Sequence, residues 1–206
     1  NFNQKHSILF GINTINKNSN QYFNSLIVTN NKFEILHQYN KIKLVPFGEF
    51  LPFENYLSKI GLKKITEGYG SFARGKTQKN IIINKINFLP LICYEIIFPE
   101  LTQKASNKTN LIVNISEDGW FGNTIGPQQH FAKAIFRSIE NNSFLVRSAN
   151  KGISAIISNK GEVIRKLSVN ETGSIEHNIP LINSNFKNKN DLIFFILLFT
   201  YLFIFL

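Results

Sequence analysis

The sequence predicts a layered protein of α/β or α+β class in which β-sheet carries the core. Short apolar runs of strand length recur between residues 6 and 179, and turn-forming Asn, Lys and Gly separate them. Residues 127–142 show helical periodicity instead. With 206 residues, 43% of them apolar, the chain can form a substantial core, and we expect one domain over residues 1–182.

The elements are expected in the following order. Three strands come first, the last two joined by an Asn-Asn-Lys turn, and a hairpin then runs into a buried strand after an irregular Gly-, Pro- and aromatic-rich region. Pro127 suits the first turn of the helix, and a later hairpin turns at Asn-Lys-Gly. The strands lie at residues 6–13, 24–30, 33–40, 80–95 (the hairpin, around 85–87), 110–116, 143–150, 152–159, 162–167 and 173–179; the irregular region is 47–79.

The C-terminal residues differ in character from the rest. A polar stretch at 183–191, expected to be a linker, precedes residues 192–206, which carry no charge. A core helix normally shows a polar face, and this segment offers only Thr200 and Tyr201. Because a bilayer-spanning helix needs about 20 apolar residues, we expect a transmembrane helix cut short at residue 206. The absence of any methionine leads us to expect a segment of a longer protein.

The formal charge of +10 suits nucleic acid or an anionic membrane surface. Lysines are, however, spread among Asn and Ile along the chain, without a basic stripe or an RNA-binding aromatic motif, so we expect no nucleic-acid partner. One Cys and four scattered His lack the spacing of metal ligands. We therefore expect no metal and no cofactor.

Cys93, the single cysteine, stands in "LPLICYEIIFPE" between an apolar run and a glutamate. A thiol at a strand end that leads into a helix can be activated as a nucleophile, with a backbone N–H nearby for an oxyanion. A buried, inert thiol fits the same pattern. His6, His37, His130 and His177 stand in no cysteine-protease context, so a Cys-His enzyme is not supported. The residues alone leave both readings of Cys93 open.

Three stretches taken together resemble a known pattern. They are "YNK" followed by "LVPFGEFLPF" (39–53), "LICYEIIFP" (91–99), and "NISEDGWFG" continuing through "GPQQHFAKAIFRSIENNSFLVRSANKGISAIIS" (114–158). In this order they resemble the nitrilase, or carbon-nitrogen hydrolase, superfamily and, within it, the apolipoprotein N-acyltransferase family. The resemblance extends from about residue 6 to about residue 180. It implies an α/β fold of the nitrilase-like α-β-β-α sandwich type.

The resemblance also implies the site residues. It makes Cys93 the nucleophile, Lys41 the catalytic lysine and Glu49 a second essential glutamate, with Tyr94 and Glu95 supporting the nucleophile. The general base of the family is a glutamate in a Pro-Glu context, upstream of the segment that residues 6–13 resemble. It is expected outside this chain, and Glu34 is not assigned that role.

The aromatic residues Trp120 and Phe47 have two readings. In most proteins such residues pack in a core. Beside a lipid-handling cysteine they line an acyl groove or enter the membrane interface. We name them as candidate substrate-binding residues.

The function implied by the resemblance is N-acylation of bacterial lipoproteins through a thioester on the nucleophile. The partners it implies are a membrane phospholipid as acyl donor, a diacylated apolipoprotein as acceptor, and the lipid bilayer. It places the protein in the bacterial inner membrane with this domain facing the periplasm. Two alternatives remain: a nitrilase-like amidase acting on a small amide, and a non-catalytic module tethered to the membrane.

Overall fold

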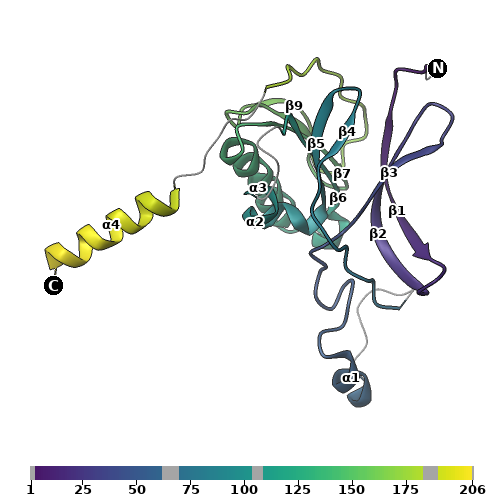
Figure 1. The fold of residues 1–206 in the computed structure, drawn as a ribbon, viewed down its shortest axis with the longest axis horizontal. Helices are drawn as coiled ribbons and strands as arrows, with labels where there is room; N and C mark the ends of the chain where they lie inside the picture. The colour runs from purple at the N-terminus through teal and green to yellow at the C-terminus, as the bar shows by residue number, and fades with distance from the viewer. Residues whose placement is uncertain (1–2, 62–69, 104–108, 183–189, 206) are drawn as a thin grey trace.

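Two β-sheets stacked face to face form the body of the protein. The computed structural model describes residues 3–61, 70–103, 109–182 and 190–205. A three-stranded sheet packs on one face of a six-stranded sheet, and helix α3 covers the other face of the larger sheet (Figure 1). The predicted layering of α and β elements around a sheet core is confirmed.

The small sheet is an antiparallel meander of β1 (Ile8–Asn16), β2 (Gln21–Thr29) and β3 (Ile35–Asn40). The predicted turn after β2 is confirmed: the Asn30 side-chain oxygen accepts from the backbone N–H groups of Lys32 and Glu34. The first strand is longer than predicted. It continues to Asn16 because a tight turn ending at Asn20, whose φ is 49°, returns the chain directly into β2.

The large sheet has the order β4-β5-β6-β7-β8-β9. Its three central strands are parallel and the outer pairs are antiparallel. The carboxyl ends of parallel strands share one edge, and the site is built at this edge. The strands are β4 (Ile81–Ile83), β5 (Ile86–Ile92), β6 (Leu111–Glu117), β7 (Phe144–Asn150), β8 (Ser154–Ile157) and β9 (Val163–Leu167).

The turns of the large sheet follow local chemistry. Asn84 and Lys85 both have positive φ and form the β4–β5 hairpin, slightly earlier than predicted. Gly161, with φ of 83°, occupies the predicted turn before β9. The strand predicted at residues 173–179 is wrong, because that segment pairs with no described strand. Ile175 and Ile179 would share one face of a strand, but a strand also requires an edge to pair with.

Two apolar clusters hold the layers together. Leu89 and Leu91 of β5 face α3, while Phe88 and Ile92 of the same strand face the small sheet. β5 is therefore buried on both faces, which explains its nearly continuous apolar sequence. Against α3 lie Leu89, Leu91, Ile96, Leu101, Ile112, Phe131, Ala134, Leu145, Ala155 and Ile157; between the sheets lie Leu26, Val28, Tyr39, Ile81, Phe88, Ile92 and Val113.

The predicted helix is confirmed as α3 (Gly126–Glu140), with Pro127 in its first turn. The region predicted to be irregular contains the short α1 (Glu54–Leu57) and η1 (Ser58–Ile60), which extend away from the sheets (Figure 1). The other short helices are η2 (Cys93–Ile97), α2 (Pro99–Gln103) and η3 (Asp118–Phe121).

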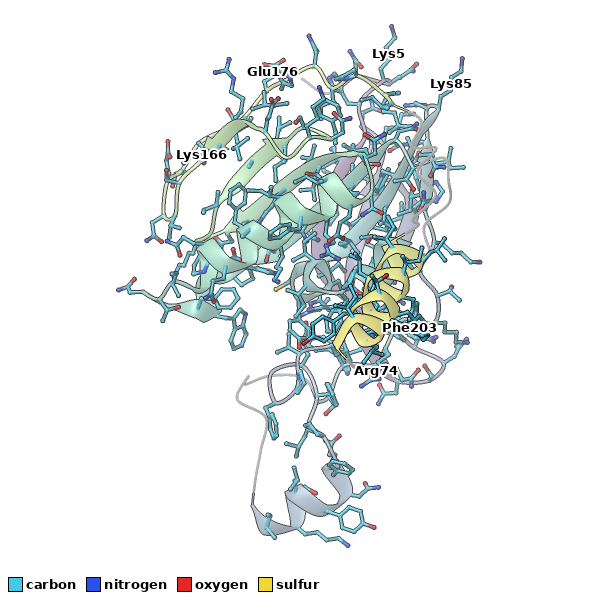
Figure 2. All side chains as sticks on the ribbon, turned by 90° about the vertical axis from the view of Figure 1, so that its left-hand side faces the viewer. Lys5, Arg74, Lys85, Lys166, Glu176 and Phe203 are labelled. Carbon is cyan, nitrogen blue, oxygen red and sulfur yellow. The ribbon has the colours of Figure 1, made fainter. Side chains whose placement is uncertain are left out.

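The apolar C-terminal segment forms helix α4 (Asn190–Phe205), which stands clear of both sheets in Figure 1. Most of the predicted linker, 183–189, lies outside the described residues, and α4 begins at Asn190. Within the described ranges, no helix has both the length and the apolar character needed to span a bilayer. Figure 2 shows Phe203 on α4, and it shows Lys85 and Lys166 on different sides of the molecule, as expected for dispersed positive charge.

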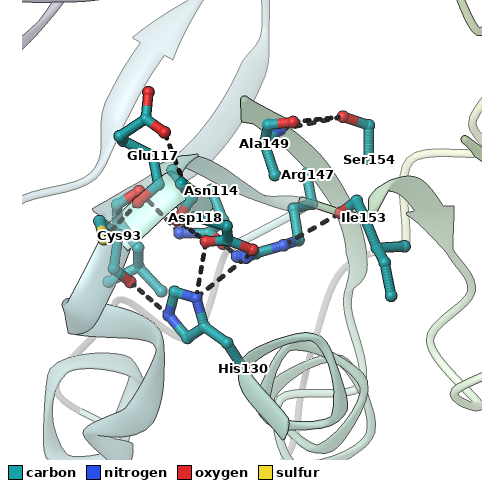
Figure 3. A network of polar contacts seen from close by, with 12 residues as sticks. Cys93, Asn114, Glu117, Asp118, His130, Arg147, Ala149, Ile153 and Ser154 are labelled. Atoms are coloured by element: carbon teal, nitrogen blue, oxygen red, sulfur yellow. Dashed lines mark hydrogen bonds and ion pairs between the residues drawn. The ribbon is translucent and has the colours of Figure 1, made fainter. Parts of the chain in front are cut away.

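A buried ion-pair network fixes the edge of the sheet beneath the site (Figure 3). Arg147 of β7 pairs with Asp118 at 2.7 Å and also donates to the side-chain oxygen of Asn114. His130 of α3 contacts Asp118 at 3.0 Å. Burial alone raises the pKa of Asp118, but the hydrogen bond with His130 and the charge of Arg147 outweigh it and lower the pKa to about 2.

Asp118→Asn is expected to lower the free energy of unfolding by about 3–5 kcal/mol at pH 7, because Arg147 is left buried without its counter-charge. The folded pKa of Asp118 lies below the ordinary value of about 3.9. The contribution of the Asp118 charge to the free energy of unfolding is therefore complete above about pH 4 and is lost as the pH falls through about 2.

Urea unfolding of the wild type and of Asp118→Asn between pH 7 and pH 2 measures this contribution. The difference between their free energies of unfolding should shrink below pH 4. The exposed Glu162 provides a matched control, since Glu162→Gln should change stability by no more than about 0.5 kcal/mol. If the difference between wild type and Asp118→Asn stays constant down to pH 2, the Asp118 charge does not stabilise the fold in this way.

Candidate active site

Cys93 lies at the carboxyl end of β5, as the first residue of η2. Its φ is 49°, the left-handed region, which is costly for any residue other than glycine and is typical of functional turns. The conformation turns the half-buried thiol out of the sheet, and Sγ lies 4.0 Å from the carbonyl oxygen of Glu117 on β6. Cys93 therefore packs at the margin of the inter-sheet cluster and also lines the cleft described below.

His130 supports the unusual backbone of Cys93. Its Nε2 lies 3.1 Å from the Cys93 carbonyl oxygen, and its Nδ1 lies 3.0 Å from both Asp118 and Arg147 (Figure 3). A carbonyl oxygen only accepts hydrogen bonds, so Nε2 carries the proton in this arrangement. The buried ion-pair network is thus joined directly to the backbone of the thiol residue.

Lys41 stands just after β3 and is almost completely buried, with 1% of its side chain exposed. Its Nζ contacts both oxygens of Glu49, at 2.9 and 2.8 Å. The Glu49 carboxylate also accepts from the Val45 backbone N–H at 2.8 Å and from the Asn24 amide at 2.7 Å. A buried cation is therefore held in a single orientation by a carboxylate that is itself fixed.

Glu95 is fully buried and ties the lysine segment to the cysteine turn. Its Oε1 accepts from the Tyr39 hydroxyl at 2.9 Å and from the backbone N–H groups of Ile42 and Lys43 at 2.6 and 3.1 Å. Its Oε2 accepts from the Ile92 N–H at 2.8 Å. Burial raises the pKa of Glu95, and its hydrogen bonds offset part of this rise. The pKa of Tyr39 is also raised, first by burial and then by the charge of Glu95.

A single cleft of about 1170 Å³ brings most of the sequence-predicted residues together. Cys93, Lys41, Glu49, Tyr94 and Trp120 all line it. Its walls include apolar side chains of β1 as well as residues of β6, η3 and α3. The cleft is large enough for an extended apolar chain.

The remaining predicted residues lie elsewhere. Glu95 does not line the cleft but lies beneath it, in the hydrogen bonds just described. Phe47 does not line it either: it occupies a turn with φ of 62° and is 45% exposed. Trp120, by contrast, is 63% exposed at the cleft, so the core reading is wrong for both aromatic residues.

Sequence reasoning missed three residues of this site: Asn24, Glu117 and His130. Asn24 and Glu117 sit on strands whose partners the sequence does not specify, and His130 carries no motif that links it to Cys93. Two ion pairs lie on and after the helix, Arg137 with Glu140 and Arg147 with Asp118. Within the described ranges, no group of three or more His, Cys, Asp or Glu side chains is placed to hold a metal ion.

Comparison with known proteins points to one family. The sequence profile of the carbon-nitrogen hydrolases matches residues 1–183. A protein of Rhizobium leguminosarum bv. trifolii named apolipoprotein N-acyltransferase is 41% identical over 157 residues, which are 76% of this chain and 29% of that protein. The protein of the same name from Brucella suis is 37% identical over 161 residues, 78% of this chain and 30% of that protein. The matched part of the chain thus spans about 30% of the length of these relatives.

Solved structures support the fold. Saccharomyces cerevisiae Nit3, a nitrilase-superfamily member, superposes with a TM-score of 0.59 at 17% identity, covering 79% of this chain and 55% of Nit3. An amidase from Nesterenkonia sp. superposes with a TM-score of 0.58 at 16% identity, covering 82% of this chain and 59% of the amidase. The nitrilase-like α/β fold expected from the resemblance is confirmed. The chain belongs to the carbon-nitrogen hydrolase family.

Proposed function

We propose that this protein transfers an acyl chain from a membrane phospholipid to the N-terminal amine of a diacylated apolipoprotein, through a thioester on Cys93. The observation that carries the proposal is the cleft itself, where a thiol on a strained turn shares one apolar-walled space with the buried Lys41–Glu49 pair. Relatives 37–41% identical to this chain are named apolipoprotein N-acyltransferase, which supports the same activity.

In the first step, the Cys93 sulfur attacks the ester carbonyl of the phospholipid. A carbon–sulfur bond forms, the carbon–oxygen bond to glycerol breaks, and the thiol proton passes through a general base to the leaving oxygen, which gives a lysophospholipid. The proposed base is the upstream glutamate implied by the family resemblance. Lys41 provides a fixed positive charge for the oxyanion, and the Tyr94 backbone N–H assists it.

In the second step, the free amine of the acceptor attacks the thioester. A carbon–nitrogen bond forms as the carbon–sulfur bond breaks, one amine proton is transferred to the sulfur, and the product is an amide. Glu49 keeps the Lys41 ammonium oriented in both steps, because its own carboxylate is held by Val45 and Asn24. Rigid placement of this charge is what makes it effective against a developing oxyanion.

Both proposed substrates are lipids, and the protein presents apolar surface to meet them. The large apolar side chains of α4 between residues 192 and 204 are 38–88% exposed, and Trp120 stands exposed at the cleft. Exposed apolar patches of this kind mark interaction or membrane surfaces. We propose that α4, about 24 Å long at 1.5 Å per residue, inserts into the inner membrane and that this domain faces the periplasm.

A nitrilase-like amidase is the second candidate. The observation that favours it is the pair of Cys93 and Lys41 in one cleft; the likeness to the Nesterenkonia amidase, at 16% identity, shows the fold alone. An amidase needs the same thiol and lysine but has no use for the exposed apolar helix α4. The two activities are distinguished by the adduct that forms on the thiol.

The Cys93 thiol is expected to carry a hydroxylamine-labile acyl group after incubation of the full-length protein with phospholipid in detergent. Intact-mass analysis should show the added acyl mass in the wild type and none in Cys93→Ala. Hydrolysis of small amides without any adduct from phospholipid would favour the amidase instead.

Lys41→Met is expected to slow acylation of Cys93 at least about 100-fold, because the charge beside the developing oxyanion is removed. Lys43→Met provides a matched control: Lys43 lies two positions along the chain and pairs with Glu100 near the surface. It should change the rate no more than a few-fold. Single-turnover acylation rates compare the variants, and equal rates for both would remove Lys41 from the mechanism.

Helix α4 is expected to react with a photoactivatable carbene probe confined to the lipid phase when the protein is reconstituted in vesicles. Peptides from residues 192–204 should be labelled, while those from β9 should not, because β9 belongs to the sheet and α4 stands clear of it. Mass spectrometry of the digested protein locates the label. Similar labelling of both segments would contradict the lipid contact.

A further inference from the structure

Glu117 places a second carboxylate on the wall of the cleft, beside the thiol. It is the last residue of β6, and its backbone oxygen lies 4.0 Å from Cys93 Sγ. Figure 3 shows its side chain at the same edge of the sheet as Cys93, on the side away from His130. The side chain is exposed and lines the cleft. The carboxylate and the thiol thus line one cleft, so a ligand that extends along this wall can contact both.

The Glu117 carboxylate is held in place by uncharged donors. Oε1 accepts from the Gly119 backbone N–H at 2.8 Å, and Oε2 accepts from the Asn150 amide at 2.5 Å. Each oxygen accepts one of these hydrogen bonds and retains a further lone pair. The side chain is therefore oriented before any ligand arrives, and its charge is not neutralised by these donors.

The two carboxylates that line the cleft differ in their electrostatic surroundings. Glu49 is neutralised by Lys41. Glu117 takes part in none of the ion pairs formed among the described residues, although Lys133 lines the same cleft and the Lys151 side chain runs past Gly119. An oriented carboxylate that forms no salt bridge with a described residue, in a cleft whose walls are largely apolar, is suited to a cationic ligand.

We propose that Glu117, supported by Asn150, binds a primary alkylammonium group in the cleft next to Cys93. An ammonium has three N–H donors, which match the free lone pairs of the carboxylate and the backbone oxygen of Glu117. A neutral alcohol or amide gains much less from this carboxylate, because charge-assisted hydrogen bonds are the stronger ones. The site is a reversible ion pair and involves no covalent step.

Two substrates of the proposed reaction carry such a group, and in this respect the inference rests on the proposed function. One is the N-terminal amine of the acceptor, which is protonated in neutral solution. The other is an ethanolamine head group on the phospholipid donor. Binding next to the sulfur would hold the first beside the thioester, which it attacks as the free amine after losing one proton to water, or would select the second as donor.

The ammonium site is tested first without acyl transfer. n-Butylammonium chloride should slow the alkylation of Cys93 by iodoacetamide in a saturable way, and n-butanol should do so much less. Glu117→Gln should weaken the ammonium protection about tenfold or more, the loss expected for a charged hydrogen bond. Lys133→Gln, which removes a positive charge from the same cleft, should leave protection equal or stronger. Undiminished protection in Glu117→Gln would overturn the proposal.

Acyl transfer then identifies the source of the ammonium group. The acylated full-length protein is given either a diacylated lipopeptide amine or hydroxylamine, which is uncharged at neutral pH. Glu117→Gln should slow transfer to the lipopeptide about tenfold or more and leave transfer to hydroxylamine much less affected. If the variant instead loses a preference for ethanolamine over glycerol head groups in the donor, the site binds the head group. If Glu117→Gln alters neither the preference for lipopeptide over hydroxylamine nor the preference for ethanolamine over glycerol head groups, Glu117 has no role in the reaction. If wild type forms no thioester, the proposed function fails, and the alkylation test still decides the ammonium site.

Discussion

The buried carboxylate of Glu95 is the interaction on which the site depends. Its hydrogen-bond partners come from two segments that belong to different sheets: Tyr39, Ile42 and Lys43 at the end of β3, and Ile92 at the end of β5. All four partners donate, so the carboxylate satisfies backbone N–H groups that would otherwise be buried without partners. Burial of the charge has a cost, visible in the raised pKa of Glu95. In return, the lysine and the thiol, which come from distant parts of the chain, are held in one cleft.

A second constraint acts on the thiol from the opposite side. The left-handed conformation of Cys93 persists because His130 binds its carbonyl oxygen, and His130 is held in turn by the Asp118–Arg147 pair. Three elements, η3, α3 and β7, therefore converge on one peptide group. Precise placement of the sulfur follows from this rigidity, whereas the ligand-facing groups Glu117 and Trp120 stay exposed. The buried groups Glu95 and Asp118 fix the geometry, the buried Lys41 reaches the cleft from its wall, and the exposed Glu117 and Trp120 stand in it.

Much of the fold could be predicted because its signals are local. The turn after β2 follows from Asn30, the turn before β9 from Gly161, and the extent of α3 from Pro127 and its apolar periodicity. The site was harder to predict. Cys93, Lys41 and Glu49 were named through a family resemblance, since nothing in their spacing shows that β3 and β5 end at the same cleft. The roles of His130 and Glu117 depend on which strands are neighbours and on where α3 crosses the sheet, which the sequence does not state. The segment 173–179 was predicted as a strand from its local sequence, but it pairs with no described strand.

Amide hydrogen exchange in wild type and Glu95→Leu addresses the Glu95 connection most directly. The substitution keeps a side chain of similar size but removes both acceptor oxygens, so the N–H groups of Ile42, Lys43 and Ile92 all lose their partner. Peptides covering 40–46 and 90–96 should lose protection together, while a peptide from α3 keeps it. Unchanged protection in both peptides, or loss confined to one of them, would show that the lysine segment and the cysteine turn are positioned independently of Glu95.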